Sequence, residues 1–266
     1  MQRQKTEAKN IKLAGLFVFL VGGLVIMSLM VKLFFTIADS HFDGTHKFNV
    51  VFASSKNINV VSFSPSNNSL SILKIYGTTK PEDISKELRV PIDGIINSKE
   101  PTSDRSIAST VFKAIFPLGN SYQKMTIVDL IRIFLFSRSV SENSIYIREL
   151  LPGLNSVQKS TLINLSFTDP SIYQENQSIE IINSTDISGL GARLAEVITN
   201  MGGDVILVSG ASDVENKSKI VYDGNTTYTI RKLSGFLQIP LEKSDKKGIA
   251  DVIIIIGKDS VGKINF

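Results

Sequence analysis

Residues 178–210 read SIEIINSTDISGLGARLAEVITNMGGDVILVSG and contain a complete strand–helix–strand pattern. The opening run SIEIINS is mostly apolar, as in a buried strand. Apolar residues then recur at helical spacing, at Leu190, Leu194, Val197, Ile198 and Met201. Two glycines end this helical pattern, and the apolar run VILVSG follows them. We therefore predict a strand, a helix and a second strand in this order.

Three further elements follow toward the C-terminus. KIVYDG (219–224) is typical of a strand, TYTIRKLSGFLQI (227–239) of a helix, and DVIIIIGKD (251–259) of a buried strand ended by glycine. The order βαββαβ commonly builds a small ferredoxin-like sandwich with its helices on one face. We expect such a domain over residues 176–266, with the first and last strands as neighbours inside the sheet.

This C-terminal unit resembles the LytR C-terminal domain of bacterial envelope proteins. The family pattern is a strand, an Asn-Gly-Thr-type turn, Ser-Gly-Leu-Ala, a helix, a valine-rich strand and a closing Gly-Lys-Asp. The residues that match it are Asn183, Thr185, Ser188, Gly189, Leu190, Ala192, Gly257, Lys258 and Asp259. The chain departs from it at Ser184 and Asp186. The resemblance implies a cell-envelope protein.

The turn and helix start supply the candidate binding residues Asn183, Thr185, Ser188 and Gly189. Ser188 can cap the helix, and exposed amides there can hold an anion or a sugar hydroxyl. The alternative is a plain capped helix in which Gly191 allows close packing. A dinucleotide fingerprint is excluded, because Leu194 stands where a third glycine or alanine belongs.

The preceding residues 47–175 predict a mixed α/β domain. FNVVFAS, INVVSFS and LSILKIY, which begin at residues 48, 58 and 70, are expected strands. Helical patterns cover 106–116, 126–136 and 156–167. Asp129 and Arg132 have the spacing of an ion pair on a helix surface.

The order and spacing of these strands resemble those at the start of the LytR-CpsA-Psr catalytic domain. In that family, aspartates and arginines after the first and third strands hold a metal and the pyrophosphate of a polyprenyl-linked glycopolymer. Here those places read Ser54-Ser55-Lys56 and Ile75-Tyr76-Gly77. Phosphoryl transfer needs cations to balance the developing charge, and Lys56 alone does not replace them. We expect a degenerate domain with no catalytic residues and no cofactor.

An N-terminal run of 19 residues without charge extends from Leu13 to Val31. As a helix it spans roughly 28 Å, close to the hydrocarbon thickness of a bilayer. The run is longer than the apolar core of a cleaved signal peptide, which is the alternative. We expect a basic tail at 1–12, a transmembrane helix at 13–38 and a polar linker at 39–46.

The charge distribution gives an orientation and excludes a nucleic-acid partner. Residues 1–32 hold five basic residues and one acidic residue, and the remaining 234 hold 24 of each. The positive-inside rule places the N-terminus in the cytoplasm and the rest outside. Since no basic excess remains outside, no domain is suited to neutralise phosphates of nucleic acid.

The sequence lacks features that several other functions require. Cysteine is absent, and His41 and His46 are the only histidines, without a further ligand motif, so we expect a solvated linker and no metal site. The cytoplasmic tail is too short for a DNA-binding fold, which excludes direct transcriptional control. We expect a bacterial membrane protein, not an enzyme, that binds cell-wall polymer or an envelope partner. The alternative is a diverged phosphotransferase that attaches lipid-linked glycopolymer to peptidoglycan.

Overall fold

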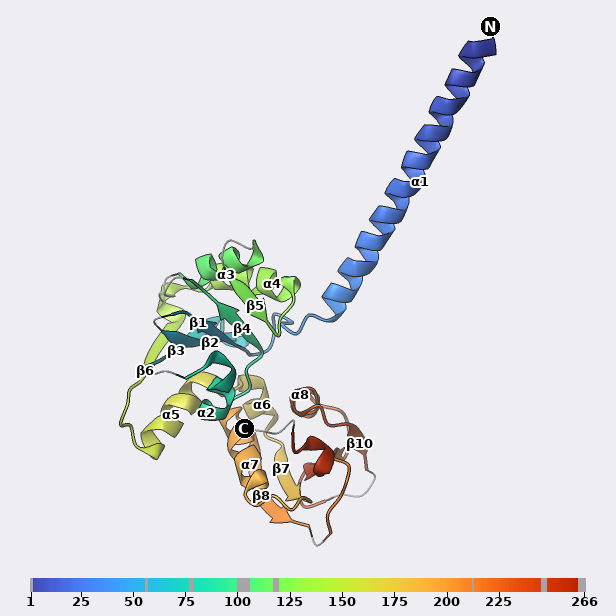
Figure 1. Ribbon diagram of the computed structural model, residues 1–266. Coiled ribbons are helices and arrows are strands. Elements are labelled where there is room, and N and C mark those ends of the chain that lie inside the picture. Colours follow the sequence, from blue (N-terminus) through green and yellow to red (C-terminus); the bar gives the residue numbers. More distant parts are fainter. Residues whose placement is uncertain are drawn as a thin grey trace.

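Figure 1 shows the computed structural model, in which a long helix extends away from two α/β domains. The structure describes residues 2–55, 57–76, 79–99, 106–116, 120–211, 213–244 and 248–262. Lys56 and Gly77, two of the positions compared with the phosphotransferase family, lie outside the described residues. The predicted fold class, a mixed α/β protein with an apolar N-terminal helix, is confirmed.

The N-terminal helix α1 runs from Gln2 to Ala38, so it begins before the predicted span. Its segment Phe17–Ala38 has 22 residues, a mean hydropathy of 2.4 and no buried residue. Length and composition make this helix able to cross a membrane. Its apolar side chains have no protein partner that covers them.

The middle domain contains a six-stranded sheet of order β5-β4-β1-β2-β3-β6. Its strands are β1 Phe48–Ala53, β2 Ile58–Ser64, β3 Ser69–Ile75, β4 Gly94–Asn97, β5 Ser121–Gln123 and β6 Ile145–Leu150. Every residue of β1 and β2 is buried. Strands buried on both faces need a cover on each side.

Helices cover both faces of this sheet, as Figure 1 shows. Helices α3 (Ile107–Ile115) and α4 (Ile127–Ser139) pack on one face. Helices α2 (Ile84–Leu88) and α5 (Ser156–Phe167) pack on the other. The three predicted strands and three predicted helices are present, whereas α2, β4, β5 and β6 were not predicted.

The C-terminal domain contains a five-stranded sheet of order β10-β9-β11-β7-β8. Its elements are β7 Ser178–Asn183, α7 Leu190–Asn200, β8 Asp204–Gly210, β9 Lys219–Tyr222, α8 Tyr228–Leu237, β10 Leu241–Lys243 and β11 Val252–Ile256. The first and last predicted strands, β7 and β11, are parallel neighbours inside the sheet, which confirms their predicted placement. The core also takes in Ile172 of α6 (Pro170–Glu175).

The ferredoxin-like arrangement is wrong in two respects. The unpredicted β10 adds a fifth strand at one edge, and α7 connects two strands, β7 and β8, that are direct parallel neighbours. In a ferredoxin-like sandwich another strand separates such a pair. Gly191 lets α7 lie close to its own strand pair, since a Cβ there would meet Val208 at 3.0 Å and Asn183 at 3.5 Å.

Candidate functional site

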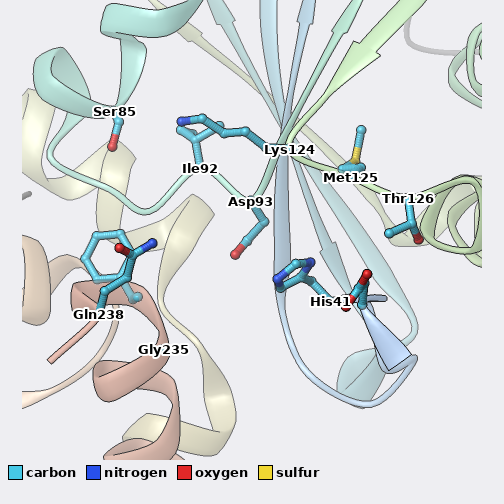
Figure 2. Close-up of a pocket in the computed structure, with 11 residues that line it drawn as sticks. His41, Ser85, Ile92, Asp93, Lys124, Met125, Thr126, Gly235 and Gln238 are labelled. Carbon is cyan, nitrogen blue, oxygen red and sulfur yellow. The ribbon is translucent and has the colours of Figure 1, made fainter. Parts of the chain in front are cut away.

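A cavity of about 680 Å³ lies where the linker that follows α1 meets both domains. The middle domain contributes Ser85, Ile92, Asp93 and residues 124–126, and the linker contributes Asp39 and His41. The C-terminal domain contributes Gly235, Phe236 and Gln238, from α8 and the residue after it. Figure 2 shows the side chains of His41 and Asp93 on one side of this junction cavity and Gln238 on the other.

The linker that borders the cavity is held by Asp129 of α4. One carboxylate oxygen, Oδ1, accepts hydrogen bonds from Ser40 Oγ at 2.7 Å, His41 N at 2.9 Å and Phe42 N at 2.8 Å. The other oxygen, Oδ2, accepts from Thr126 N at 2.7 Å and Thr126 Oγ at 2.8 Å. Thr126 and Asp129 also form the capping box of α4. One buried carboxylate therefore caps a helix and fixes the linker.

Arg132, one turn further along α4, holds the same linker. Its Nη1 donates to Ser40 Oγ at 3.0 Å and to the Phe42 carbonyl at 2.7 Å. The predicted surface ion pair between Asp129 and Arg132 is therefore wrong, because Asp129 is fully buried and both side chains bind residues 40–42. We call Asp129, Arg132 and residues 40–42 the linker latch.

Asp129 stays ionised inside the protein. Burial raises the pKa of its carboxyl, but hydrogen bonds from Phe42, Thr126 and Ser40 outweigh burial, so the pKa lies below its ordinary value. A carboxylate that accepts several hydrogen bonds is stabilised in its charged form.

The linker also reaches the C-terminal domain through His46. Its ring stacks on Tyr228 with 3.7 Å between centroids, and its Nδ1 pairs with Asp43. The Tyr228 hydroxyl donates to Asp169 Oδ2 at 2.8 Å. His41 is exposed, as expected of a solvated linker, whereas His46 is only partly exposed and packs between its own turn and α8.

The walls of the junction cavity combine apolar and polar groups. Ile92, Met125 and Phe236 supply apolar surface, and Asp93 and Lys124 supply charge. Asp93 is already engaged, since its Oδ2 accepts from Asn49 N at 2.8 Å and its Oδ1 lies 3.3 Å from Lys232 Nζ. In the described part of the chain, no group of three or more histidine, cysteine, aspartate or glutamate residues could hold a metal ion. The arrangement suits binding of an amphiphilic group.

The predicted binding residues of the C-terminal turn lie together, but their polar atoms bind one another. Asn183 Oδ1 accepts from Thr185 N at 3.2 Å and Thr185 Oγ1 at 2.7 Å, and Asn183 Nδ2 donates to the Ile187 carbonyl at 2.9 Å. Ser188 is exposed and does not cap α7. The N-cap is Gly189, with φ +75° and no side-chain cap. A binding role for these four residues stays a prediction.

The closing Gly-Lys-Asp motif has a structural role. Asp259 Oδ1 accepts hydrogen bonds from Ser218 N at 2.8 Å and Ser218 Oγ at 2.6 Å. A Cβ on Gly257 would lie 2.6 to 2.9 Å from the backbone of Lys217, closer than real contacts allow. The motif fastens the end of β11 to the loop before β9.

The strand ends compared with the phosphotransferase family lie apart from the junction cavity. The end of β3 borders a cavity of about 220 Å³ whose lining includes Tyr76, Glu87 and Lys159. Ser54, at the end of β1, turns back to donate from its Oγ to the Asn57 carbonyl at 3.0 Å.

Sequence reasoning did not find the junction cavity, because its lining comes from segments far apart in the chain. One signal was available. Thr126 and Asp129 have the spacing of a capping box, which predicts that the carboxylate turns back toward the helix start and not outward. The partners of Asp129 Oδ1 lie 87 to 89 residues away in the sequence, so no local pattern indicates them.

Comparison with known proteins supports the C-terminal domain. Residues 176–259 match the model of the family described as LytR cell envelope-related transcriptional attenuator. Among solved structures, Lmo1026 of Listeria monocytogenes has a TM-score of 0.31 and 14% identity, over 42% of this chain and 83% of that one. TagT of B. subtilis has a TM-score of 0.31 and 13% identity, over 47% of this chain and 92% of that one. No curated protein matches the chain. The predicted family of the C-terminal unit is thus confirmed, and residues 176–259 form a LytR C-terminal domain.

Proposed function

We propose that this chain is a single-pass membrane protein of the bacterial cell envelope that binds cell-wall polymer or an envelope partner without catalysis. Its N-terminus lies in the cytoplasm, and both α/β domains lie outside the membrane. The C-terminal domain supplies one wall of the binding site.

The proposal rests on an uncovered apolar helix in the same chain as a domain of an envelope family. The 22 residues Phe17–Ala38 have no protein contacts that bury them, and a bilayer is the environment that such a helix needs. The basic residues before the span, and the lack of lysine and arginine between Ala38 and Lys47, favour the cytoplasmic N-terminus.

The junction cavity supports the binding role. It begins directly after α1 ends, and α8 of the C-terminal domain borders it. Its volume of about 680 Å³ falls in the range of pockets that hold small ligands. Its mixed apolar and polar lining suits a ligand that carries both kinds of group.

Retention on purified cell wall tests the proposal. The soluble region from Asp39 onward should sediment with the wall material, and Phe236→Ala, which removes apolar wall from the cavity, should weaken retention. Leu207→Ala changes an exposed apolar residue of β8, away from the cavity, and serves as the matched control. Equal retention of all three proteins would contradict a role for this cavity, and no retention would contradict wall binding.

The alternative of a diverged phosphotransferase has its own test. The same region is incubated with magnesium and a lipid-pyrophosphate substrate. We expect no hydrolysis. Hydrolysis that survives purification and is lost in Lys56→Ala would favour the enzyme.

A further inference from the structure

A second cavity, of about 520 Å³, lies inside the middle domain, away from the junction cavity. It is bordered by one face of the sheet, by α5 and by the turn between α5 and α6. Its volume also falls in the range of ligand pockets. We call it the serine pocket, after Ser64, Ser69 and Ser71 in its wall.

The strand register explains why this part of the sheet is polar. Ser64 of β2 pairs with Ser69 of β3, and Ser71 of β3 pairs with Tyr146 of β6. Side chains at alternate positions share one face of a sheet, so these residues lie together. Further along the same strands the face becomes apolar, and α5 packs on it. Only the polar end of the face borders the cavity.

Three buried polar atoms around the serine pocket have no hydrogen-bond partner within the described part of the chain. They are Ser64 Oγ, Arg148 Nη1 and Asn164 Oδ1. The Ser64 residue is only 4% exposed. A buried polar group without a hydrogen bond costs about 1–3 kcal/mol, so three such atoms around one cavity favour a polar ligand that bonds to them.

The charged side chains that line the serine pocket are positive. Among the described residues that line it are two cations, Lys47 and Arg148, and no carboxylate. The acidic group that acts on Lys47, Asp169, accepts from Ser171 N at 2.9 Å and from the Tyr228 hydroxyl at 2.8 Å. Lys47 Nζ donates to the Thr168 carbonyl at 2.9 Å. The described lining therefore holds two cations, and the charge of Asp169, which lies outside the lining, acts on one of them, Lys47.

The ionisation of Lys47 agrees with this arrangement. The pKa of Lys47 is lowered to about 8, mainly by burial and also by the charge of Arg148, while the charge of Asp169 acts to raise it. Lys47 is therefore still mostly protonated at pH 7. An anion between the two cations would raise its pKa, and by linkage protonated Lys47 would hold the anion more tightly.

We propose that the serine pocket binds a phosphorylated, hydroxyl-bearing small molecule such as a sugar phosphate. Arg148 and Lys47 hold the phosphate, because guanidinium and ammonium groups are the usual partners of phosphate oxygens. Ser64 and Asn164 bind the hydroxyl groups of the same ligand. This site is separate from the junction cavity and does not depend on the proposed wall binding.

Calorimetry on the full-length protein in detergent micelles tests the site. Glucose 6-phosphate should bind, inorganic phosphate should bind more weakly, and glucose should show no heat. Arg148→Gln should weaken binding of glucose 6-phosphate by about tenfold or more, since it removes a hydrogen bond between two charged groups. Ser64→Ala should weaken binding by about two- to tenfold, since it removes a hydrogen bond between neutral groups. Lys86→Gln, at an exposed residue of α2, is the matched control and should bind normally.

The pH dependence is a second readout. Binding should be stronger at pH 7 than at pH 9.5, because Lys47 loses its proton between them. The charged and titratable groups around Lys47 are Asp169 from the start of α6 and Arg148 and Tyr146 from β6. Melting curves verify that each variant is folded. Absence of heat with both phosphate probes, or unchanged binding in both Arg148→Gln and Ser64→Ala, would overturn the proposal.

Discussion

Asp129 joins parts of the chain that lie far apart in sequence. Its five hydrogen bonds close the first turn of α4 and fix residues 40–42 of the linker. The sequence predicted the helix, but the carboxylate was expected on the surface, because its spacing to Arg132 was interpreted as an ion pair and its capping-box spacing to Thr126 was overlooked. A single charged residue in a short polar pattern does not indicate whether it is buried.

Asp129→Asn should destabilise the middle domain by about 3 kcal/mol, since an amide nitrogen cannot accept the bonds that one carboxylate oxygen now accepts. Thermal melting followed by circular dichroism measures the loss. Asp223→Asn, at an exposed aspartate, should change stability little. A melting curve equal to that of the wild type would show that the linker latch does not contribute.

The lowered pKa of Asp129 also predicts a pH dependence. Because the unfolded chain binds the proton more readily, this stabilisation is fully present above the unfolded pKa of about 4 and is lost as pH falls through the lower folded pKa. Denaturant midpoints at pH 7 and pH 3 should therefore differ more in the wild type than in Asp129→Asn. An identical difference in both proteins would contradict the assignment.

Gly257→Ala should destabilise the C-terminal domain by about 1–3 kcal/mol, because a Cβ there collides with the backbone of Lys217. Gly235→Ala is the matched substitution. It has open space around it and lies inside α8, where alanine is favoured over glycine by roughly 0.5–1 kcal/mol. The two changes should move the melting temperature in opposite directions. Shifts of the same sign would remove the steric explanation.

At the scale of elements, helices and strands with long hydrophobic patterns were predictable from the sequence, whereas very short strands were not. The apolar runs that became β1, β2, β3, β7 and β11 and the amphipathic patterns of α7 and α8 were recognised from sequence. Strand β4 has four residues and β10 has three, too few for a period to show. Strand β6 lies at the sheet edge, where its exposed residues do not alternate with buried ones. Such strands form because a neighbour offers hydrogen bonds, which one sequence does not show.

Two substitutions in strand β11 test which face of the C-terminal sheet is buried. Ile254 is fully buried under the helices, whereas Ile255 points to the other face and is partly exposed. Ile254→Asp should unfold the domain, since a buried unpaired carboxylate costs several kcal/mol against a total of roughly 5–15. Ile255→Asp keeps its carboxylate near water and Lys219, its partner position on β9, and should remain folded. Circular dichroism melts of both variants decide, and equal effects would contradict the assignment of faces.

At the scale of the whole molecule, the two domains and the linker contact one another at several places. Arg89 pairs with Glu196, Asn200 Nδ2 donates to the Arg89 carbonyl at 2.9 Å, and Lys232 pairs with Asp93. None of these pairs was predictable, because each joins residues whose separation in sequence carries no pattern. The order of the parts, an apolar N-terminal helix followed by two α/β domains, was predictable from composition and periodicity.

The orientation of the chain in the membrane is open to a direct test. Protease added to intact protoplasts should digest the region after Asp39, and an epitope tag at the N-terminus should survive until the cells are lysed. Protection of both domains in intact protoplasts, with digestion only after lysis, would reverse the proposed topology. Detergent-solubilised protein is the control that shows the cleavage sites are accessible.

The linker latch has a consequence for how this protein searches its surroundings. Helix α1 ends at Ala38 and the latch begins at Ser40, so only Asp39 lies between them. A long flexible linker would let the domains occupy a large volume, which would lower their effective concentration near any one target. Under the proposed membrane anchoring, α1 acts as a short stalk that restricts the height and tilt of the junction cavity above the bilayer. Diffusion in the plane of the membrane then becomes the main search, and targets held at that height are met at a high effective concentration.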